Sequence, residues 1–168
     1  MIPPSTAASG TGDPSGSNAL RRAVEEVEEF VATGGWDAPR QVFALVRTSE
    51  LLAAEPGLAA QVHPQEPSEP AGAEFTPLAQ EALPGDSIAD ALATIAWPDE
   101  VAGCVLVLEI LAGAGEDQRE ARLAAGVLRD RPGGACLLRW RHAPDGPVLR
   151  GPDLAPGLLA ALHGTFEP

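Results

Sequence analysis

The sequence predicts an α+β domain: an antiparallel sheet of four to five strands with helices mainly on one face, ending in a C-terminal helix. The segment VAGCVLVLEIL (101–111) is apolar at consecutive positions, as in a strand buried on both faces. Two further strand patterns, at 119–130 and 135–142, flank the turn sequence RPGG and indicate a β-hairpin. Strands and helices do not alternate regularly, which argues against a parallel βαβ array.

The N-terminal part divides into a tail and a helix. Residues 1–17 are rich in Pro, Gly, Ser and Thr and are predicted to be a disordered tail, with a single domain over 18–168. Ser17 or Asn18 is predicted to cap the first helix, which stops at Gly34 and Gly35. Its apolar positions recur at helical spacing, at Leu20, Val24, Val27 and Val31. Its glutamates are expected to face water: Glu25, Glu26, Glu28 and Glu29.

The middle of the chain contains a strand, a short helix and a loop. The apolar run 42–46 predicts a buried strand, and Thr48 or Ser49 is expected to cap a helix through about Ala54. Residues 63–74 combine prolines and glutamates without periodicity and are predicted to be a surface loop. Residues 75–83 stay ambiguous between a strand and a helical turn, because Pro77 permits either.

Two more helices are expected. Asp86 or Ser87 is predicted to cap a helix that ends before Trp97, since Pro98 disfavours helical geometry at the residue before it. A strand-like piece at 147–150 leads to Asp153, which is predicted to cap the final helix. The first of these helices carries Ile88, Leu92 and Ile95, and the second carries Leu154, Leu158, Leu159 and Leu162.

Composition limits the partners and the compartment. A formal net charge of −13 makes binding to a phosphate backbone unfavourable, so no nucleic acid is expected. The apolar runs are too short to span a bilayer, and the N-terminus lacks a signal-peptide pattern, so we expect a cytoplasmic protein without membrane contact. Cys104 and Cys136 lie on strands that could be neighbours and are interpreted as buried, inert thiols.

No pattern points to catalysis, a cofactor or a metal. The chain contains no Lys, so the glycine-bearing segments cannot form a Walker motif. His63, His142 and His163 belong to no metal-binding pattern, and no GxSxG motif is present. We therefore predict no catalytic, cofactor-binding or metal-binding residue, and a non-enzymatic function is favoured.

The arginines form the strongest feature. All eleven basic residues are Arg, and residues 119–150 hold seven of them against three acidic residues, a local charge of +4. Arg139 and Arg141 are expected to share one strand face, with Leu138 and Trp140 on the other. This pattern predicts a cationic outward face on the hairpin. The candidate partner-binding residues are Arg119, Arg122, Arg129, Arg139, Trp140 and Arg141.

We weigh three interpretations of these arginines. They pair internally with the protein's own acidic helices and loops, or they bind an acidic protein surface or a second copy of the chain, with Trp140 or Trp97 as an anchor. In the third they bind an anionic small molecule or nucleic acid. The leading functional hypothesis is a non-enzymatic protein-interaction or regulatory domain. The alternative is an enzyme or binder of an anionic small molecule whose site joins arginines to the WDAP (36–39) and WPDE (97–100) turns.

Three segments carry a resemblance: GGWDAPRQVFALVRTSELL (34–52), WPDEVAGCVLVLE (97–109) and RLAAGVLRDRPGGACLLRWR (122–141). In their order and in overall length, they resemble a family of conserved actinobacterial proteins of unknown function, typified by a propionibacterial hypothetical protein. The resemblance spans about residues 18–166 and implies a single cytoplasmic domain. It brings no activity, cofactor or site residue. The tail and the GAGED connection (113–117) are where this chain is expected to differ from its relatives.

Overall fold

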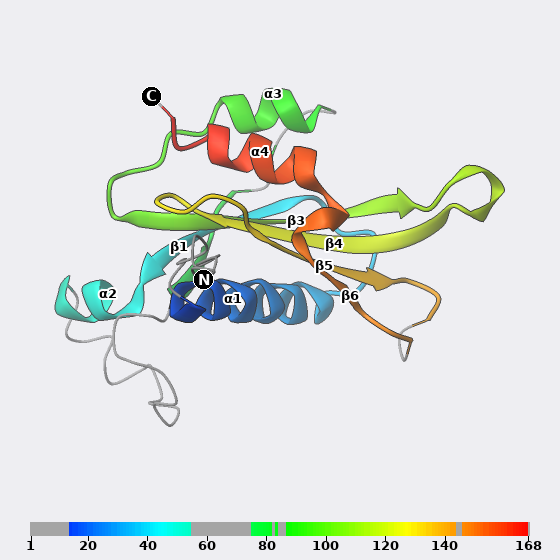
Figure 1. The fold of residues 1–168 in the computed structure, drawn as a ribbon, viewed down its shortest axis with the longest axis horizontal. Helices are drawn as coiled ribbons and strands as arrows, with labels where there is room; N and C mark the ends of the chain where they lie inside the picture. Colours follow the sequence, from blue (N-terminus) through cyan, green and yellow to red (C-terminus); the bar gives the residue numbers. More distant parts are fainter. Residues whose placement is uncertain (1–13, 55–74, 82, 84–86, 144–145, 168) are drawn as a thin grey trace, which may run out of the picture.

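The computed structural model of the protein describes residues 14–54, 75–81, 83, 87–143 and 146–167 (Figure 1). Within these ranges the chain forms one antiparallel sheet of six strands in the order β2-β1-β3-β4-β5-β6. The strands are β1 (Gln41–Arg47), β2 (Phe75–Ala79), β3 (Val101–Ala112), β4 (Arg119–Leu128), β5 (Ala135–Trp140) and β6 (Leu149–Arg150). The predicted α+β class, antiparallel sheet and C-terminal helix are confirmed.

The predicted number of four to five strands is wrong, because both edges carry a strand with a weak pattern. The ambiguous segment after residue 74 is the edge strand β2, which pairs with β1 and includes Pro77. Proline is tolerated at a sheet edge, where its missing N–H removes no ladder bond from a second neighbour. At the other edge, the strand-like piece predicted at 147–150 forms β6, which has only two residues and pairs with β5.

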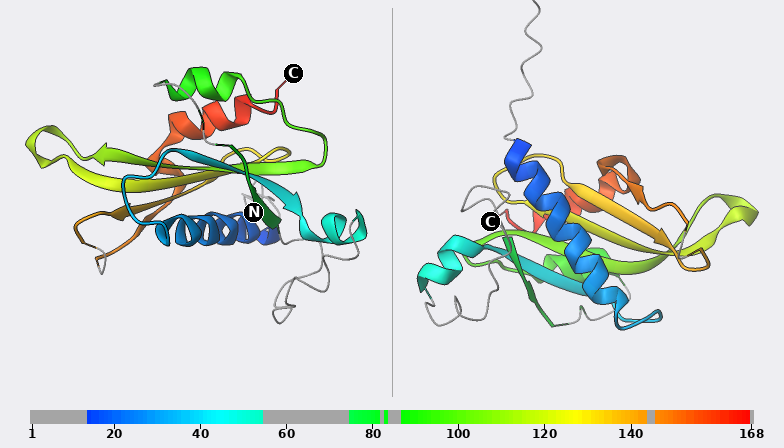
Figure 2. Two further views of the ribbon diagram at one scale, coloured as in Figure 1. Left: turned by 180° about the vertical axis from the view of Figure 1, so that it is seen from behind. Right: turned by 90° about the horizontal axis from the view of Figure 1, so that it is seen from below.

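Helices cover both faces of the sheet, so the expectation that they lie mainly on one face is also wrong. Helix α1 (Pro14–Ala32) crosses one face diagonally, and α3 (Ile88–Ala93) and α4 (Pro156–Gly164) cover the other (Figures 1 and 2). The short helix α2 (Thr48–Ala54), which was predicted, lies at one end of the sheet. We call the two surfaces of the sheet the α1 face and the α4 face. Two layers form because the central strands are apolar on both sides.

The α1 face holds one of the two cores. Val24 and Val27 of α1 pack against Leu45, Val105 and other buried residues of the sheet. Gly126 lies beneath the helix, and a Cβ atom placed there would lie 2.7 Å from Cγ2 of Val24. A glycine at this position therefore lets α1 lie close to β4.

The first helix begins earlier than its sequence indicates. It starts at Pro14, so Ser17 and Asn18 lie inside the helix and the prediction that one of them caps it is wrong. Proline is favoured in the first turn, where its missing N–H costs no helical hydrogen bond. Residues 14–17 of the predicted tail are thus helical. Residues 1–13 of that tail lie outside the described residues, as does the loop predicted at 63–74.

The α4 face holds the second core, in which Leu159 and Leu162 of α4 pack against β-strand residues. Ser87 caps α3 as predicted, and its side chain accepts a hydrogen bond from the backbone N–H of Asp90. The predicted cap of the final helix is wrong. Asp153 lies in a separate 3₁₀ turn, η3 (Pro152–Leu154), and α4 begins at Pro156. A proline again suits the first helical position.

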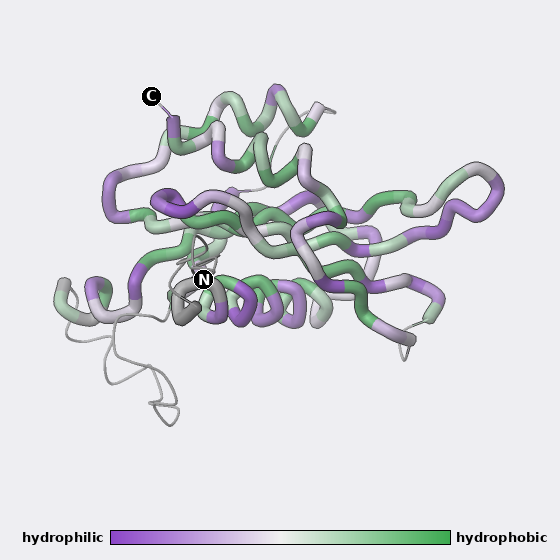
Figure 3. Tube along the Cα trace, in the orientation of Figure 1, coloured by the Kyte–Doolittle hydropathy of each residue, from purple (hydrophilic) through white to green (hydrophobic). Residues whose placement is uncertain are grey.

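Figure 3 shows hydrophobic positions concentrated along the strands between the two helical layers, with hydrophilic positions along α1 and at the turn between β3 and β4. In the described part of the chain, every helix is too short or too polar to cross a bilayer.

Candidate functional site

The sheet divides the six predicted site residues between its two faces. Arg122 and Arg139 are cross-strand partners on β4 and β5, and with Arg141 they contact side chains or backbone of α1 and the turn after it. The other three lie on the α4 face: Arg119, Arg129 and Trp140. The structure therefore does not bring the six residues together on one outward surface. The reason is strand alternation, since Arg119 and Arg122 are an odd number of residues apart.

Glu28 of α1 lies at the centre of the α1-face group. Its side chain is fully buried, with 0% of the residue exposed, so the expectation that it faces water is wrong. Its Oε1 accepts hydrogen bonds from Nε of Arg139 at 2.7 Å and from Nη1 of Arg122 at 3.3 Å. A sequence signal for this burial existed, because Glu28 follows Val24 by four residues and shares its face of the helix.

Arg122 is the buried partner of this carboxylate, with 2% of the residue exposed. Its Nη2 donates to the carbonyl oxygen of Gly35 at 2.8 Å, and its guanidinium carbon lies 4.3 Å from the ring centroid of Trp36. Its Nε is buried without a hydrogen-bond partner among the described residues. The hydrogen bond to Glu28 raises the pKa of Arg139 above its usual range. The guanidinium of Arg139 is thus held charged against α1.

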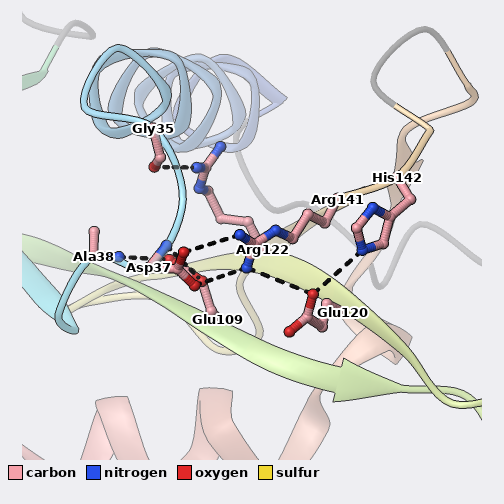
Figure 4. Close-up of polar contacts among 8 residues, drawn as sticks. All are labelled: Gly35, Asp37, Ala38, Glu109, Glu120, Arg122, Arg141 and His142. Atoms are coloured by element: carbon pink, nitrogen blue, oxygen red, sulfur yellow. Dashed lines mark hydrogen bonds and ion pairs between the residues drawn. The ribbon is translucent and has the colours of Figure 1, made fainter.

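The turn after α1 is held by side chains from neighbouring strands (Figure 4). Arg141, which directly follows β5, donates through Nη1 and Nη2 to the two carboxylate oxygens of Asp37, at 2.7 and 2.9 Å. Glu109 of β3 accepts from the backbone N–H groups of Asp37 and Ala38, at 3.0 and 2.8 Å. Asp37 has a φ of 67°, a left-handed conformation that is uncommon for residues other than glycine.

These contacts affect the ionisation of the Asp37 carboxylate. The hydrogen bond from Arg141 lowers the pKa of Asp37, so its carboxylate stays ionised into the acid range. Arg141 also lies 3.5 Å from Glu120, whose carboxylate is 3.4 Å from His142 (Figure 4). The arginines that contact the turn after α1, Arg122 and Arg141, therefore already have hydrogen-bonding partners within the protein.

On the α4 face, Arg129 plays a comparable role for the WPDE turn. Its Nη2 donates to the carbonyl oxygen of Pro98 at 2.7 Å, and Nη1 lies 3.7 Å from Asp99. Its guanidinium carbon lies 4.9 Å from the ring centroid of Phe166, near the C-terminus. The WPDE turn and the WDAP turn thus bind arginines on opposite faces of the sheet.

Arg119 and Trp140 form a different arrangement. Arg119 is exposed, and its guanidinium carbon lies 4.3 Å from the ring centroid of the half-buried Trp140. Strand register places Ile110 and Ala112 of β3 beside this pair, and both are half-buried. We call these four residues the docking patch: Ile110, Ala112, Arg119 and Trp140. Among the described residues, Arg119 pairs with no carboxylate.

The two cysteines are free and buried. Both point into the α4-face core, but Cys104 is on β3 and Cys136 on β5, so β4 separates them and they are not on neighbouring strands. Burial raises the pKa of Cys104 to about 12 and also raises the pKa of Cys136. Such thiols are poor nucleophiles and poor metal ligands. In the part of the chain that the structure covers, no three His, Cys, Asp or Glu side chains are grouped as metal ligands.

Comparison with known proteins identifies a family. The family model described as PPA1309-like protein matches residues 20–115 and 111–167, and these two stretches overlap at the end of β3 and the turn to β4. Neither the curated proteins nor the solved structures contain a match. The family description names no activity, so no residue role is transferred. Because the two matched stretches together cover most of its length, the chain belongs to the PPA1309-like protein family.

Proposed function

We propose that the protein is a non-enzymatic protein-interaction domain and that the docking patch is its binding surface. The observation that carries this proposal is the Arg119–Trp140 pair, an exposed guanidinium stacked on a half-buried indole. Arg and Trp are the residue types most enriched among the side chains that dominate binding energy at protein interfaces. Of the six predicted site residues, this pair is the best suited to a partner.

The other four predicted arginines are less suited to a partner, because they already bind groups within the protein. Arg122, Arg139 and Arg141 donate to Glu28, Gly35 and Asp37, and Arg129 donates to Pro98. A partner that recruited them would have to break these contacts, and for Arg122 it would leave a buried charge unpaired. Arg119 carries no such cost, because the residue is exposed and pairs with no carboxylate among the described residues.

The chemistry of the patch defines its partner. Ile110 and Ala112 provide apolar surface beside the indole of Trp140, and Arg119 provides a planar donor for a carboxylate. The expected partner is an acidic protein surface that also presents an apolar side chain. A second copy of this acidic chain is the other partner to test, since it carries abundant carboxylates of its own.

We also propose that the protein is cytoplasmic and comes from an actinobacterium. Two unpaired, buried cysteines support a reducing compartment. The arginine-only basic residues and the high content of Gly and Pro support a GC-rich genome. Binding of an anionic small molecule is the second candidate function, and it is favoured by a basic-rimmed cavity between α1 and β6.

Charge reversal tests the docking patch. The tagged wild-type protein, Arg119→Glu and a matched control, Arg47→Glu, are used to capture partners from the native host. Arg47 is an apt control because it also lies over an aromatic ring, Phe75, at the opposite end of the sheet. We expect at least one protein to be captured by the wild type and Arg47→Glu but lost with Arg119→Glu. Identical captured sets for all three would refute the proposal.

Sedimentation separates the two partner classes. If the partner is a second copy, the wild-type protein sediments as a dimer at micromolar concentration and Arg119→Glu sediments as a monomer. If the partner is another protein, both sediment as monomers and the difference appears only in the capture experiment.

A further inference from the structure

A small cavity lies between α1 and the β5–β6 edge of the sheet, away from the docking patch. Its volume is about 60 Å³ and it is partly open to solvent. The wall is mostly apolar and includes Val24, Ala135 and Leu137, which belong to the α1-face core, and Pro152. The apolar wall favours contact with an apolar group over contact with water, because it offers water few hydrogen-bond partners.

The rim of the cavity is basic, in contrast to the protein as a whole. Arg21, Glu25 and Arg150 line it, which gives two guanidinium groups for one carboxylate. Arg150 donates through Nε to Glu25 at 2.8 Å, and the Arg150 side chain is 58% exposed. Arg21 donates to the side-chain oxygen of Asn18. The net charge of −13 makes a local excess of positive charge unusual for this chain.

We propose that this cavity binds a carboxylate that bears a small apolar group, with the apolar group inside and the carboxylate at Arg21 and Arg150. This inference concerns the second candidate function, and it does not depend on the docking patch. A guanidinium suits a carboxylate because its planar N–H groups match the two oxygens. Glu25 occupies one donor of Arg150 in the unliganded protein and acts as an internal competitor.

The size of the cavity limits the apolar group. A single water needs a cavity of roughly 10–15 Å³, so a cavity of about 60 Å³ accommodates a group of about four heavy atoms. A three- or four-carbon tail or a branched aliphatic side chain fits this limit. Two sources share the chemistry: a free short-chain carboxylic acid, and the C-terminal residue of a peptide that ends in an aliphatic side chain.

Nuclear magnetic resonance titration with butyrate tests the site. We expect saturable shifts of backbone amides at the cavity wall, such as those of Val24 and Leu137. Butyramide, which has the same tail without the charge, should bind at least about tenfold more weakly, since charge-assisted hydrogen bonds to Arg are lost. Shifts that do not saturate, that map elsewhere, or that are equal for the two compounds would overturn the proposal.

Two pairs of variants separate ligand binding from a structural role. Arg150→Ala should weaken butyrate binding by about tenfold, whereas Arg22→Ala, an equal charge change outside the rim, should leave it unchanged. Glu25→Gln should tighten binding several-fold by freeing Arg150, and Glu26→Gln, its exposed neighbour, should not. A purely structural role for Glu25 predicts no tightening. Weakened binding in Glu25→Gln contradicts the proposal.

Two further comparisons identify the source of the carboxylate and test the cavity independently of the docking patch. If a short peptide ending in valine binds more tightly than butyrate, and its amidated form does not bind, the ligand is a chain terminus. If the peptide binds more weakly than butyrate, the ligand is a free acid, and either result supports a carboxylate site. Arg119→Glu should bind butyrate like the wild type, so failure of one site leaves the other testable.

Discussion

Glu28 and Arg122 are both buried and bind each other across the interface between α1 and β4. Arg139, directly opposite Arg122 on β5, binds the same carboxylate. One acidic side chain on the helix is therefore shared by two basic side chains on adjacent strands. A helix that slid or rotated on the sheet would leave buried charges unpaired, so this group determines how α1 packs.

Removing the shared carboxylate should strongly destabilise the protein. Glu28→Ala leaves Arg122 buried without its charge partner, and we expect the free energy of unfolding to fall by about 3–5 kcal/mol in urea denaturation. Glu29→Ala, at the adjacent exposed position, should change it by no more than about 0.5 kcal/mol. Similar effects in the two variants would show that the buried group does not hold α1.

The ion pair between Asp37 and Arg141 should make stability depend on acid pH. The hydrogen bond from Arg141 lowers the pKa of Asp37 below its ordinary value of 3.8, so this contribution is complete above that value and is lost as the pH falls through the lowered pKa. The melting temperature of wild type should exceed that of Asp37→Asn at neutral pH. The gap should close in strong acid, and high salt should narrow it because the pair is exposed. A gap independent of pH would contradict this role.

Two glycine substitutions should have opposite effects. Gly126→Ala places a methyl group 2.7 Å from Cγ2 of Val24 and should destabilise the protein by about 1–3 kcal/mol. Gly157→Ala, in the first turn of α4, meets no atom within 4 Å and should stabilise it by about 0.4–1 kcal/mol. If α1 packing is the cause, the double variant Gly126→Ala/Val24→Ala should lose less stability than the sum of the two single losses, because Val24 is itself buried. Thermal and urea unfolding of the double variant and of the three single variants measure these effects.

The thiols of Cys104 and Cys136 should not react rapidly in the native protein. Because burial raises the pKa of Cys104 to about 12, that thiol stays protonated at pH values where a free thiol reacts. We expect no rapid reaction with a disulfide reagent near pH 8, and reaction of both cysteines in denaturant. By the same linkage, stability is unaffected below the ordinary value of 9.0 and decreases above it, as the unfolded thiols ionise. A fast-reacting native thiol would contradict the buried placement.

Several elements could be predicted because their signals are local. The apolar run of β3, the turn residues between β4 and β5, and the Ser87 cap each depend on neighbours in the sequence. The edge strand β2 could not be assigned, because its pairing with β1 is a contact between distant residues. The start of α1 at Pro14 was missed because a capping residue closer to the apolar stripe offered an equally plausible beginning.

The arginine surface shows the same division. Clustering of positive charge in 119–150 and its strand pattern are visible in the sequence, and internal pairing is one of the three interpretations that they allow. That Glu28 would be buried against Arg122 and Arg139 could be suspected from its place four residues after Val24, but helical spacing alone does not say which polar residue lies on the packed side. The contact between Arg119 and Trp140 could not be predicted, because it depends on the register between β4 and β5.

Sequence alone determined the fold class, most of the strands and helices, and the acidic chain with its basic hairpin, because propensity, periodicity and charge are properties of residues close together along the chain. Tertiary structure alone decided that helices cover both faces of the sheet, that most of the hairpin arginines have internal partners, and that the docking patch and the basic-rimmed cavity lie apart. The physical reason is that strand register and helix rotation set which side chains meet, and both are chosen by packing between distant segments.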